Sequence, residues 1–292
     1  MKTIFVAGAK GQIGCELQEL AGQYPGFDFL FTDLPELDIT DETILQSFLA
    51  GKPIDYVINC AAYTAVDKAE SDPETARKVN VTGVENLAHY CRQNKVPLLH
   101  FSTDYVYHND QNRPFKEGDS TSPKGVYAKT KLEGDQAALQ IQPNTLILRT
   151  SWVYSAYGHN FVKTMLRLGR DRDSLNVIFD QIGTPTYAHD LAKAVMNVLQ
   201  AVENKAIDVQ SFSGIYHYSN EGVTSWYDFA KAIFEIEDIN CKVNPIETKD
   251  YPTPAARPHF SVLNKAKFRN TFKQEIPHWR ESLKVCLKKL RN

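Results

Sequence analysis

The sequence predicts an α/β protein built on a doubly wound parallel sheet with a smaller C-terminal lobe, and three observations predict it. Short apolar runs alternate with longer amphipathic stretches through residues 1–150. The short runs are rich in Val, Ile, Leu and Phe, which is typical of strands buried on both faces. A glycine-rich turn directly follows the first run. Together these features indicate a Rossmann-like architecture.

The alternation assigns each stretch of 1–150 to a strand or a helix in turn. Nearly continuous apolar runs are interpreted as strands, and runs with one apolar face in a period of about 3.6 residues as helices. We expect strands at 3–8, 27–33, 54–62, 96–103 and 144–150, and helices at 12–22, 41–50, 73–94 and 121–141.

The rhythm loosens after Thr150, which suggests a division of the chain. We predict a first domain over residues 1–150, and a smaller lobe mainly over 151–292. The strand-like 175–180 and the helix-like 188–204 could still belong to the first domain, which therefore receives parts of 174–204. We assign 214–219, 226–237 and 251–258 to the lobe, over the carboxyl ends of the strands, where open α/β sheets bind ligands.

Composition argues against several classes of protein. Charged residues make up 23% and the net charge is −2, so no basic field attracts nucleic acid or an anionic membrane surface. Apolar runs are too short for a signal peptide or a membrane-spanning helix. The 5 cysteines are odd in number and lack a C-x-x-C pair, which argues against disulfides and zinc. We expect a cytoplasmic protein with a small-molecule substrate.

The turn GAKGQIG places Gly8, Gly11 and Gly14 between the first strand and the first helix. Glycine lets the chain turn tightly and lets backbone N–H groups approach a pyrophosphate at the helix N-terminus. A merely tight turn is the alternative, but the position at the start of an alternating chain favours a dinucleotide site. The other residues expected beside the cofactor in this turn are Lys10, Gln12 and Ile13.

Two carboxylates bear on the choice of cofactor. Asp33 ends the second strand, where a carboxylate can hydrogen-bond the adenosine ribose, and this favours NADH. Lys10 could instead approach the 2′-phosphate of NADPH, so both cofactors stay open. Asp38 either caps the helix that begins near Asp41 or contacts the adenine.

Tyr127 and Lys131 lie four residues apart in the expected helix 121–141, so they project on the same side about one turn apart. Alone, such a pair is usually a solvated helix face. Thr103, at the carboxyl end of strand 96–103, favours a catalytic interpretation. Reduction of a ketone needs a proton donor and a second donor that holds the carbonyl. We predict Tyr127 as the acid, Thr103 as the second donor, and Lys131 as a cation that lowers the pKa of Tyr127.

This set resembles the Ser/Thr, Tyr, Lys triad of the short-chain dehydrogenase/reductase family, and VNVTGVENLA resembles its extended branch, which acts largely on nucleotide sugars. Further segments resemble the dTDP-4-dehydrorhamnose reductases of that branch. They are AAYTAVDKAE (61–70), FSTDYVY (101–107), YAKTKLEGD (127–135), LRTSWVY (148–154), NFVKTMLRL (160–168) and YPTPAARP (251–258).

The resemblance implies that residues 1–150 form an NAD(P)-binding domain and that 151–292 form mainly a sugar-nucleotide-binding lobe. It implies NAD(P)H-dependent reduction of the C4 keto group of dTDP-4-dehydro-6-deoxy-L-mannose, which gives dTDP-L-rhamnose in the last step of its synthesis for surface polysaccharide. It implies that Lys131 holds the nicotinamide ribose beside Tyr127 and that Asn80 supports a proton-relay water. We also expect small and hydroxyl-bearing residues at the end of strand 54–62 and just after it to line the cofactor, namely Ala61, Ala62 and Tyr63.

Five residues are expected at the substrate. Thr103 and Asp104 follow a strand end, and Trp152 lies just past another, where it lines a pocket or packs in the core. Lys68 and Arg257 are either surface charges or the cations that a diphosphate requires.

Two other features limit the resemblance. His189 stands where the family pattern has a carboxylate that helps to bind an intersubunit metal with a glutamate such as Glu16. We therefore predict no metal, and a homodimer is left open. His100, His108 and His217 have no metal-ligand spacing and receive no role.

The sequence leaves two alternatives to the reductase. An epimerase or dehydratase of the same family is one, but Asp104 lacks the glutamate that follows it in dehydratases. A regulatory subunit resembling the partner of methionine adenosyltransferase is the other. Such a chain need not retain the triad, whereas Thr103, Tyr127 and Lys131 are all present.

Overall fold

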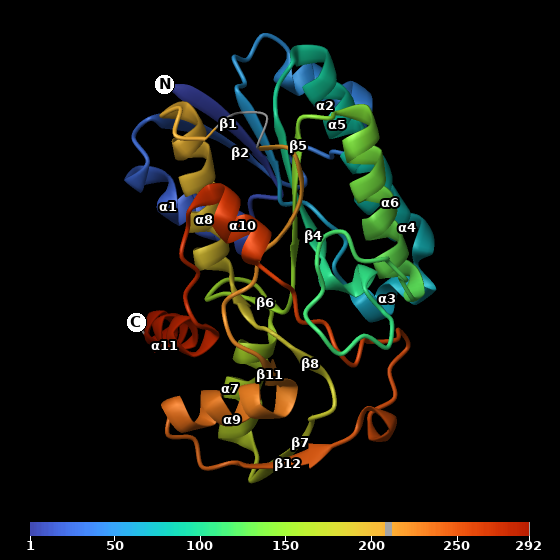
Figure 1. Ribbon diagram of the computed structural model, residues 1–292, viewed down its shortest axis with the longest axis vertical. Helices are drawn as coiled ribbons and strands as arrows, with labels where there is room; N and C mark the ends of the chain where they lie inside the picture. Colours follow the sequence, from blue (N-terminus) through green and yellow to red (C-terminus); the bar gives the residue numbers. More distant parts are fainter. Residues whose placement is uncertain (208–211, 292) are drawn as a thin grey trace.

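The computed structural model describes residues 1–207 and 212–291, and a six-stranded parallel sheet lies at its centre (Figure 1). The strand order is β10-β5-β4-β3-β1-β2, and every neighbouring pair is parallel. The strands are β1 (Lys2–Ala7), β2 (Phe27–Thr32), β3 (Tyr56–Asn59), β4 (Leu98–Thr103), β5 (Thr145–Thr150) and β10 (Gly214–His217).

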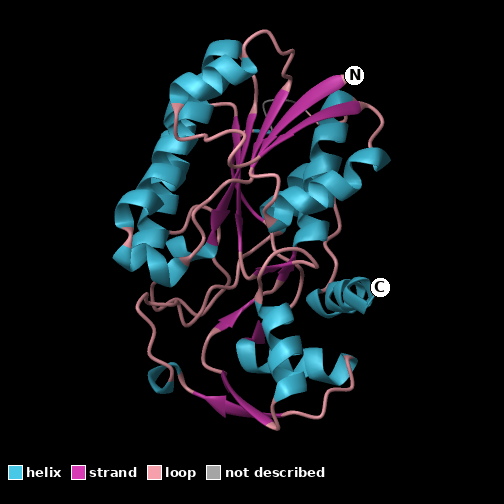
Figure 2. Ribbon diagram, turned by 180° about the vertical axis from the view of Figure 1, so that it is seen from behind, coloured by secondary structure: helices cyan, strands magenta, loops and turns pink. Residues whose placement is uncertain are grey.

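Helices cover both faces of this sheet, as Figures 1 and 2 show. Alternate residues of a strand point to opposite faces, so Ile4 and Val6 pack in one cluster with α1 and α8, while Phe5 and Ala7 pack in another with α2 and α5. The helices are α1 (Gln12–Leu20), α2 (Glu42–Leu49), α3 (Val66–Ser71), α4 (Pro73–Arg77), α5 (Gly83–Asn94), α6 (Gly125–Ile141) and α8 (Ala188–Glu203), and Lys78–Thr82 form a π-helical turn between α4 and α5. The predicted doubly wound, Rossmann-like fold is confirmed.

The strand order reverses at β1, which pairs with β2 on one side and with β3 on the other. Ligands of open α/β sheets bind at such a switch point, outside the carboxyl ends of the strands. Here those ends carry the glycine turn after β1 and the segment Cys60–Tyr63 after β3.

A smaller lobe lies below the carboxyl ends of the strands in Figure 1. Its apolar cluster is formed largely by side chains of α7, α9 and α11, with β7 and β12 beside them. The elements of the C-terminal half are β6 (Val153–Tyr154), α7 (Phe161–Asp171), β7 (Ser174–Ile178), β8 (Ile182–Gly183), β9 (Thr186–Tyr187), β11 (Thr224–Ser225), α9 (Trp226–Ile236), β12 (Lys242–Ile246), α10 (Ala266–Phe272) and α11 (Trp279–Arg291). In the described part of the chain, no helix combines the length and the apolar character that a membrane crossing needs.

Two segments lie elsewhere than the sequence suggested. Residues 174–178 pair with β12 in a separate two-stranded sheet, so this strand belongs to the lobe. Residues 214–217, which we assigned to the lobe, pair with β5 as the outermost strand of the large sheet. The helix 188–203 packs against α1 and covers the sheet, as expected. The chain therefore crosses between the two regions more than once.

Candidate active site

The glycine turn is held tightly against the end of β3. Gly8 has φ of +77°, and a Cβ there would lie 2.4 Å from the backbone nitrogen of Ala61. A Cβ on Gly14 would lie 2.4 Å from the carbonyl oxygen of Gly8. At Gly11 the same atom would meet only this carbonyl oxygen, at 3.3 Å. Gly8 and Gly14 thus serve the turn itself, while the space beside Gly11 is open at the start of α1, where a pyrophosphate fits.

Asp33 and Lys10 are brought together by this turn. The Lys10 backbone N–H donates to Asp33 Oδ2 over 2.7 Å, and Lys10 Nζ donates to the Leu34 carbonyl over 2.8 Å. Asp38 accepts from the backbone and the hydroxyl of Thr40, whereas Asp41 caps α2. The capping interpretation of Asp38 is therefore wrong, because the chain turns once more before the helix begins.

The other predicted cofactor residues line the neighbouring strand ends. The Ala61 N–H donates to the Asn59 side chain, and the Tyr63 N–H donates to Asn80 Oδ1 over 2.9 Å. Asn80 Nδ2 in turn contacts the Tyr63 carbonyl and the Thr130 hydroxyl. Asn80 therefore fixes the segment after β3 to α6. Ala62 is half-buried in this segment, Ile13 packs against the sheet cluster, and Gln12 bonds to Asn160 and Val153.

The three predicted catalytic side chains come from two adjacent elements, β4 and α6. The Tyr127 hydroxyl faces the Thr103 hydroxyl, whose presence acts to lower the pKa of Tyr127. Lys131 is buried, with its Nζ 2.7 Å from the Phe101 carbonyl oxygen and 3.3 Å from His100 Nε2. The roles of these residues stay predictions, but the structure places their side chains at the carboxyl end of β4.

Tyr127 is a protonated acid in this structure. Burial raises the pKa of Tyr127 to about 12, the charges of Asp104 and Asp135 act in the same direction, and the Thr103 hydroxyl opposes them. We expected Lys131 to lower this pKa. In the protein alone the Lys131 amino group instead donates to the Phe101 carbonyl and lies beside His100 Nε2, and burial lowers the pKa of Lys131 to about 8.

Asp104 is a buried carboxyl group next to Thr103. Thr103 Oγ1 donates to Asp104 Oδ1 over 3.2 Å, while Asp104 Oδ2 has no hydrogen-bond partner among the residues that the structure describes. Burial raises the pKa of Asp104 to about 7, although hydrogen bonds from Ser261 and Thr103 oppose the shift. A carboxyl group that is partly protonated at neutral pH can donate to a sugar hydroxyl as well as accept from one.

Trp152 stacks on Trp226, with ring centroids 3.6 Å apart, and so joins the strand end to the lobe. Its φ of +48° is unusual for a residue with a side chain. Gly183 is required beneath this pair, because a Cβ there would lie 2.7 Å from the Trp152 ring. The indole pair thus forms a rigid wall between the strand ends and α9.

The two predicted diphosphate ligands differ in their surroundings. Lys68 is exposed on α3. Arg257 donates to both carboxylate oxygens of Asp67 over 2.7 Å, and so ties the loop 251–258 to α3. The structure therefore brings both cations to α3, but Arg257 is already paired there.

A cluster of possible metal ligands lies on the other side of the sheet, at α1. Ligand atoms of Glu16, Glu19 and His189 lie within 4.8 Å of one another. Lys289 of α11 donates to Glu16 over 3.1 Å and also pairs with Glu19, while His189 Nδ1 lies 3.0 Å from the same Glu16 oxygen. The lysine supplies the positive charge between the carboxylates, so these residues as arranged do not fit a metal ion.

Sequence reasoning missed several residues around the triad. The ring of Tyr105 packs edge-on against Tyr127, and His100 and Asp135 lie at Lys131. One signal could have identified Asp135, because Tyr127, Lys131 and Asp135 recur every four residues on one face of α6. His100 gave no such signal, since it lies within a strand between the apolar residues Leu99 and Phe101.

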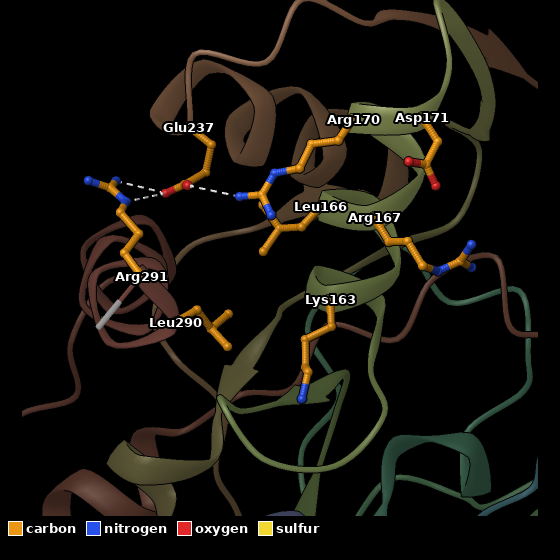
Figure 3. Close-up of a pocket in the computed structure, with 8 residues that line it drawn as sticks. All are labelled: Lys163, Leu166, Arg167, Arg170, Asp171, Glu237, Leu290 and Arg291. Carbon is orange, nitrogen blue, oxygen red and sulfur yellow. Dashed lines mark hydrogen bonds and ion pairs between the residues drawn. The ribbon is translucent and has the colours of Figure 1, made fainter.

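The open pocket in Figure 3 lies away from these residues, between α7 and α11. It is lined by cationic side chains, and Glu237 pairs with Arg170 and Arg291 across it. No member of the predicted triad or of the glycine turn lines it. It is a charged hollow on the surface of the lobe rather than the candidate active site.

Known proteins match this chain along its whole length. The profile of the family described as RmlD substrate binding domain matches residues 1–292. The dTDP-4-dehydrorhamnose reductase of Aggregatibacter actinomycetemcomitans is 40% identical over 291 residues, which cover 97% of this chain and 98% of the relative.

Solved structures agree with this match. A dTDP-4-dehydrorhamnose reductase from Clostridium acetobutylicum superimposes with a TM-score of 0.92 at 39% identity, covering 99% of this chain and 100% of that one. The dTDP-4-dehydrorhamnose reductase of Bacillus anthracis, solved in complex with NADP, has a TM-score of 0.91 at 34% identity and covers 99% of each chain. This chain belongs to the RmlD substrate binding domain family.

Proposed function

We propose that this protein is an NAD(P)H-dependent reductase that converts dTDP-4-dehydro-6-deoxy-L-mannose into dTDP-L-rhamnose. One observation carries the proposal: an acid that holds its proton, Tyr127, lies beside Thr103 and one helical turn from Lys131 in a chain that matches dTDP-4-dehydrorhamnose reductases over almost its whole length. Neither feature alone would identify the substrate.

The chain's own groups fit the demands of this reaction. The bound nicotinamide supplies the hydride. The open space at Gly11 and the N-terminus of α1 bind the pyrophosphate, and Lys131 holds the nicotinamide ribose. Thr103 orients the keto oxygen, and Tyr127 gives its hydroxyl proton to that oxygen as negative charge develops there.

Both reduced cofactors serve in this proposal. Asp33 lies within the reach of the glycine turn, where a carboxylate can bind the ribose hydroxyls of NADH, and the Lys10 ammonium lies beside it for the 2′-phosphate of NADPH. The relative from Bacillus anthracis was solved with NADP. We expect NADPH to be preferred by less than about a hundredfold, or under about 3 kcal/mol.

The dTDP-sugar is proposed to bind between the strand ends and the lobe, with Asp104 and Trp152 at the sugar and Lys68 and Arg257 toward the diphosphate. Two contacts that join the sheet to the lobe support this placement. They are the stacked rings of Trp152 and Trp226, and the ion pair by which Arg257 anchors its loop to Asp67 of α3. A cytoplasmic location and a homodimer are also proposed. The free thiols of all five cysteines support a reducing compartment.

Turnover of the purified protein tests the function directly. The dTDP-keto sugar and NADPH, or NADH, are mixed with the protein, and the nicotinamide absorbance is followed. Stoichiometric cofactor oxidation with formation of dTDP-L-rhamnose is expected. Binding without turnover would favour the regulatory-subunit alternative, and release of a different dTDP-sugar would favour an epimerase or another reductase.

A further inference from the structure

Lys131 ends in a buried polar cluster that the proposed reaction does not use. Apart from Lys131, the members come from three adjacent strands and from α6, and each side chain is at most 5% exposed. They are Asn59 of β3, His100 and Ser102 of β4, Arg149 of β5 and Asp135 of α6. Burying this many polar groups costs free energy unless each is paired, so their arrangement calls for a reason.

The hydrogen bonds of Asn59 fix which nitrogen of His100 carries the hydrogen. Asn59 Oδ1 accepts from the Ala61 N–H over 3.0 Å, so its amide nitrogen faces His100 Nδ1, 3.1 Å away. That amide nitrogen can only donate, and Nδ1 must therefore accept. The imidazole hydrogen is then on Nε2, which lies 3.3 Å from Lys131 Nζ.

This position of the hydrogen matters to Lys131. An ammonium group has donors only, so it cannot accept from Nε2–H, whereas a neutral amine can. The second group near Nε2 is Asp135 Oδ1, at 3.8 Å, which has no hydrogen-bond partner in the described part of the chain. His100 can thus direct its hydrogen toward the amine of Lys131 or toward Asp135.

Asp135 acts on Lys131 in the opposite sense. Its other oxygen accepts from Ser102 over 2.8 Å and from Arg149 Nε over 3.2 Å, which holds the carboxylate in place one turn after Lys131. The negative charge of Asp135 favours the ammonium form and partly offsets the burial that lowers the pKa of Lys131 to about 8.

We infer that Asp135 and His100 are positioning residues that together set the protonation state of Lys131: the carboxylate stabilises the ammonium, and the imidazole Nε2–H stabilises the amine. The inference deepens the proposed function, on which the importance of Lys131 rests. The pair would keep Lys131 close to the balance point between its two forms near neutral pH.

Other charged or titratable groups on the elements packed against α6 are engaged elsewhere. Arg149 also donates to the Tyr107 hydroxyl, and Asp104 contacts Thr103. On the covering helices, Asp67 pairs with Arg257, Glu70 accepts from the Val126 N–H, Arg77 pairs with Glu133, and Cys91 lies in an apolar cluster. Tyr127, one turn before Lys131 on α6, has a pKa of about 12, so it is neutral over the pH range in which Lys131 titrates.

The test measures Lys131 itself, without cofactor or substrate. Lysine labelled with ¹³C at Cε is incorporated, the Lys131 signal is assigned by its loss in Lys131→Met, and its shift is followed against pH. The wild-type midpoint is expected near 8. Asp135→Asn should lower the midpoint by about one pH unit or more, since an opposite charge is removed. His100→Gln, which can present an amide oxygen to Nζ, should raise it.

Two matched variants separate charge from structure. Ser102→Ala removes a hydrogen bond to the same carboxylate without changing its charge, and should leave the midpoint within a few tenths of a unit. Asp135→Glu keeps the charge and should restore most of the wild-type midpoint. Equal midpoints in wild type and Asp135→Asn would overturn the role of Asp135, and a midpoint in His100→Gln at or below wild type would overturn that of His100.

A second readout links the titration to function. The dissociation constant of NADPH, measured by fluorescence against pH, should weaken on the alkaline side at a lower pH in Asp135→Asn than in wild type. An unchanged alkaline limb in the variant would overturn the inference. Failure of the proposed function is distinguishable, because the protein would then lack turnover while Lys131 still titrated with the predicted variant shifts.

Discussion

The side chain of Tyr127 is held as a phenol rather than as a phenolate. Its pKa of about 12 follows from burial, with the nearby carboxylates adding to the effect. The acid of a reductase must hold its proton until the hydride is transferred, so a high pKa of Tyr127 in the protein alone suits reduction of a ketone. In the proposed reaction, Thr103 and Lys131 then stabilise the negative charge that forms on Tyr127.

Three substitutions separate the roles of these residues. Tyr127→Phe removes the acid but keeps the ring, so turnover should fall by about 10² to 10⁴ while NADPH still binds. Lys131→Met should reduce turnover and also weaken NADPH binding, because its ammonium is proposed to hold the ribose. Thr103→Ala should lie between them in turnover. Steady-state kinetics and calorimetric cofactor titration measure both quantities, and near-normal turnover of Tyr127→Phe would remove Tyr127 from the mechanism.

The positions of the three proposed catalytic residues could be predicted from sequence because they are set by local rules. Thr103 ends a strand, and Tyr127 and Lys131 are one helical turn apart. The cluster behind Lys131 could not, since His100 and Asp135 meet only when β4 and α6 pack together. Arg257 shows the same limit: its pairing with Asp67 joins residues that are far apart in sequence.

Among the elements, the turn between β1 and α1 contains glycines with different functions. Gly8 and Gly14 have backbone atoms 2.4 Å from where a Cβ would lie, but Gly11 has a single contact at 3.3 Å. The sequence gives all three the same appearance. The structure therefore predicts different outcomes for the same substitution.

Gly11→Val should fold but lose the cofactor, because its side chain would fill the open space proposed for the pyrophosphate. Gly14→Val is the matched comparison, and it should fail to fold or melt far below wild type, since its Cβ meets backbone that cannot move aside. Thermal melting and calorimetric titration with NADPH check both. Normal cofactor affinity in folded Gly11→Val would exclude the turn as the binding site.

Strand β10 adds a second prediction at this scale. His217 in this strand accepts from the Tyr107 hydroxyl at Nε2 and donates from Nδ1 to the Phe115 carbonyl. Burial, and then the charge of Arg149, lower the pKa of His217 to about 3. In the unfolded chain His217 binds a proton with a pKa near 6.5, whereas in the folded chain it stays neutral until the pH approaches 3. Its contribution to stability is therefore fully present above about pH 6.5 and is lost as the pH falls toward 3.

As the pH falls from 7 to 5, protonation of His217 in the unfolded chain should lower the free energy of unfolding by about 2 kcal/mol. His217→Gln should be less stable at pH 7 but should show a shallower loss on acidification. The exposed His89 on α5 provides the control, as His89→Gln should keep the wild-type slope. Urea unfolding at several pH values measures these slopes. Parallel curves for wild type and His217→Gln would contradict the assignment.

The strands also show what the sequence pattern can and cannot specify. Apolar runs predicted the first five strands of the sheet, because a strand buried on both faces has few alternatives. The same pattern does not say which sheet a strand joins. Residues 174–178 and 214–217 are both short, and their pairing with β12 and β5 is decided by the path of the chain between the two regions.

At the scale of the whole molecule, the two regions are joined where the substrate is proposed to bind. The chain returns from the lobe to the sheet as β10, leaves again, and then comes back through the loop 251–258 to α10, which packs on β10. Arg257 fixes that loop to α3 through Asp67, and Trp152 fixes the strand end to α9 through Trp226. These contacts around the proposed site, together with the pairs that Lys289 of α11 makes with Glu16 and Glu19 of α1, hold the two regions in place relative to each other.

The pair of Arg257 and Asp67 allows the structural and the binding role of the loop to be separated. Arg257→Ala removes both the ion pair and a cation for the diphosphate, so the KM for the dTDP-sugar should rise about tenfold, or about 1.4 kcal/mol, beyond any loss in melting temperature. Asp67→Asn breaks the same ion pair but leaves the guanidinium available. It should lower the melting temperature about as much while changing this KM far less. If both variants raise the KM equally, Arg257 acts only by anchoring the loop, and the diphosphate must be bound by other cations such as Lys68.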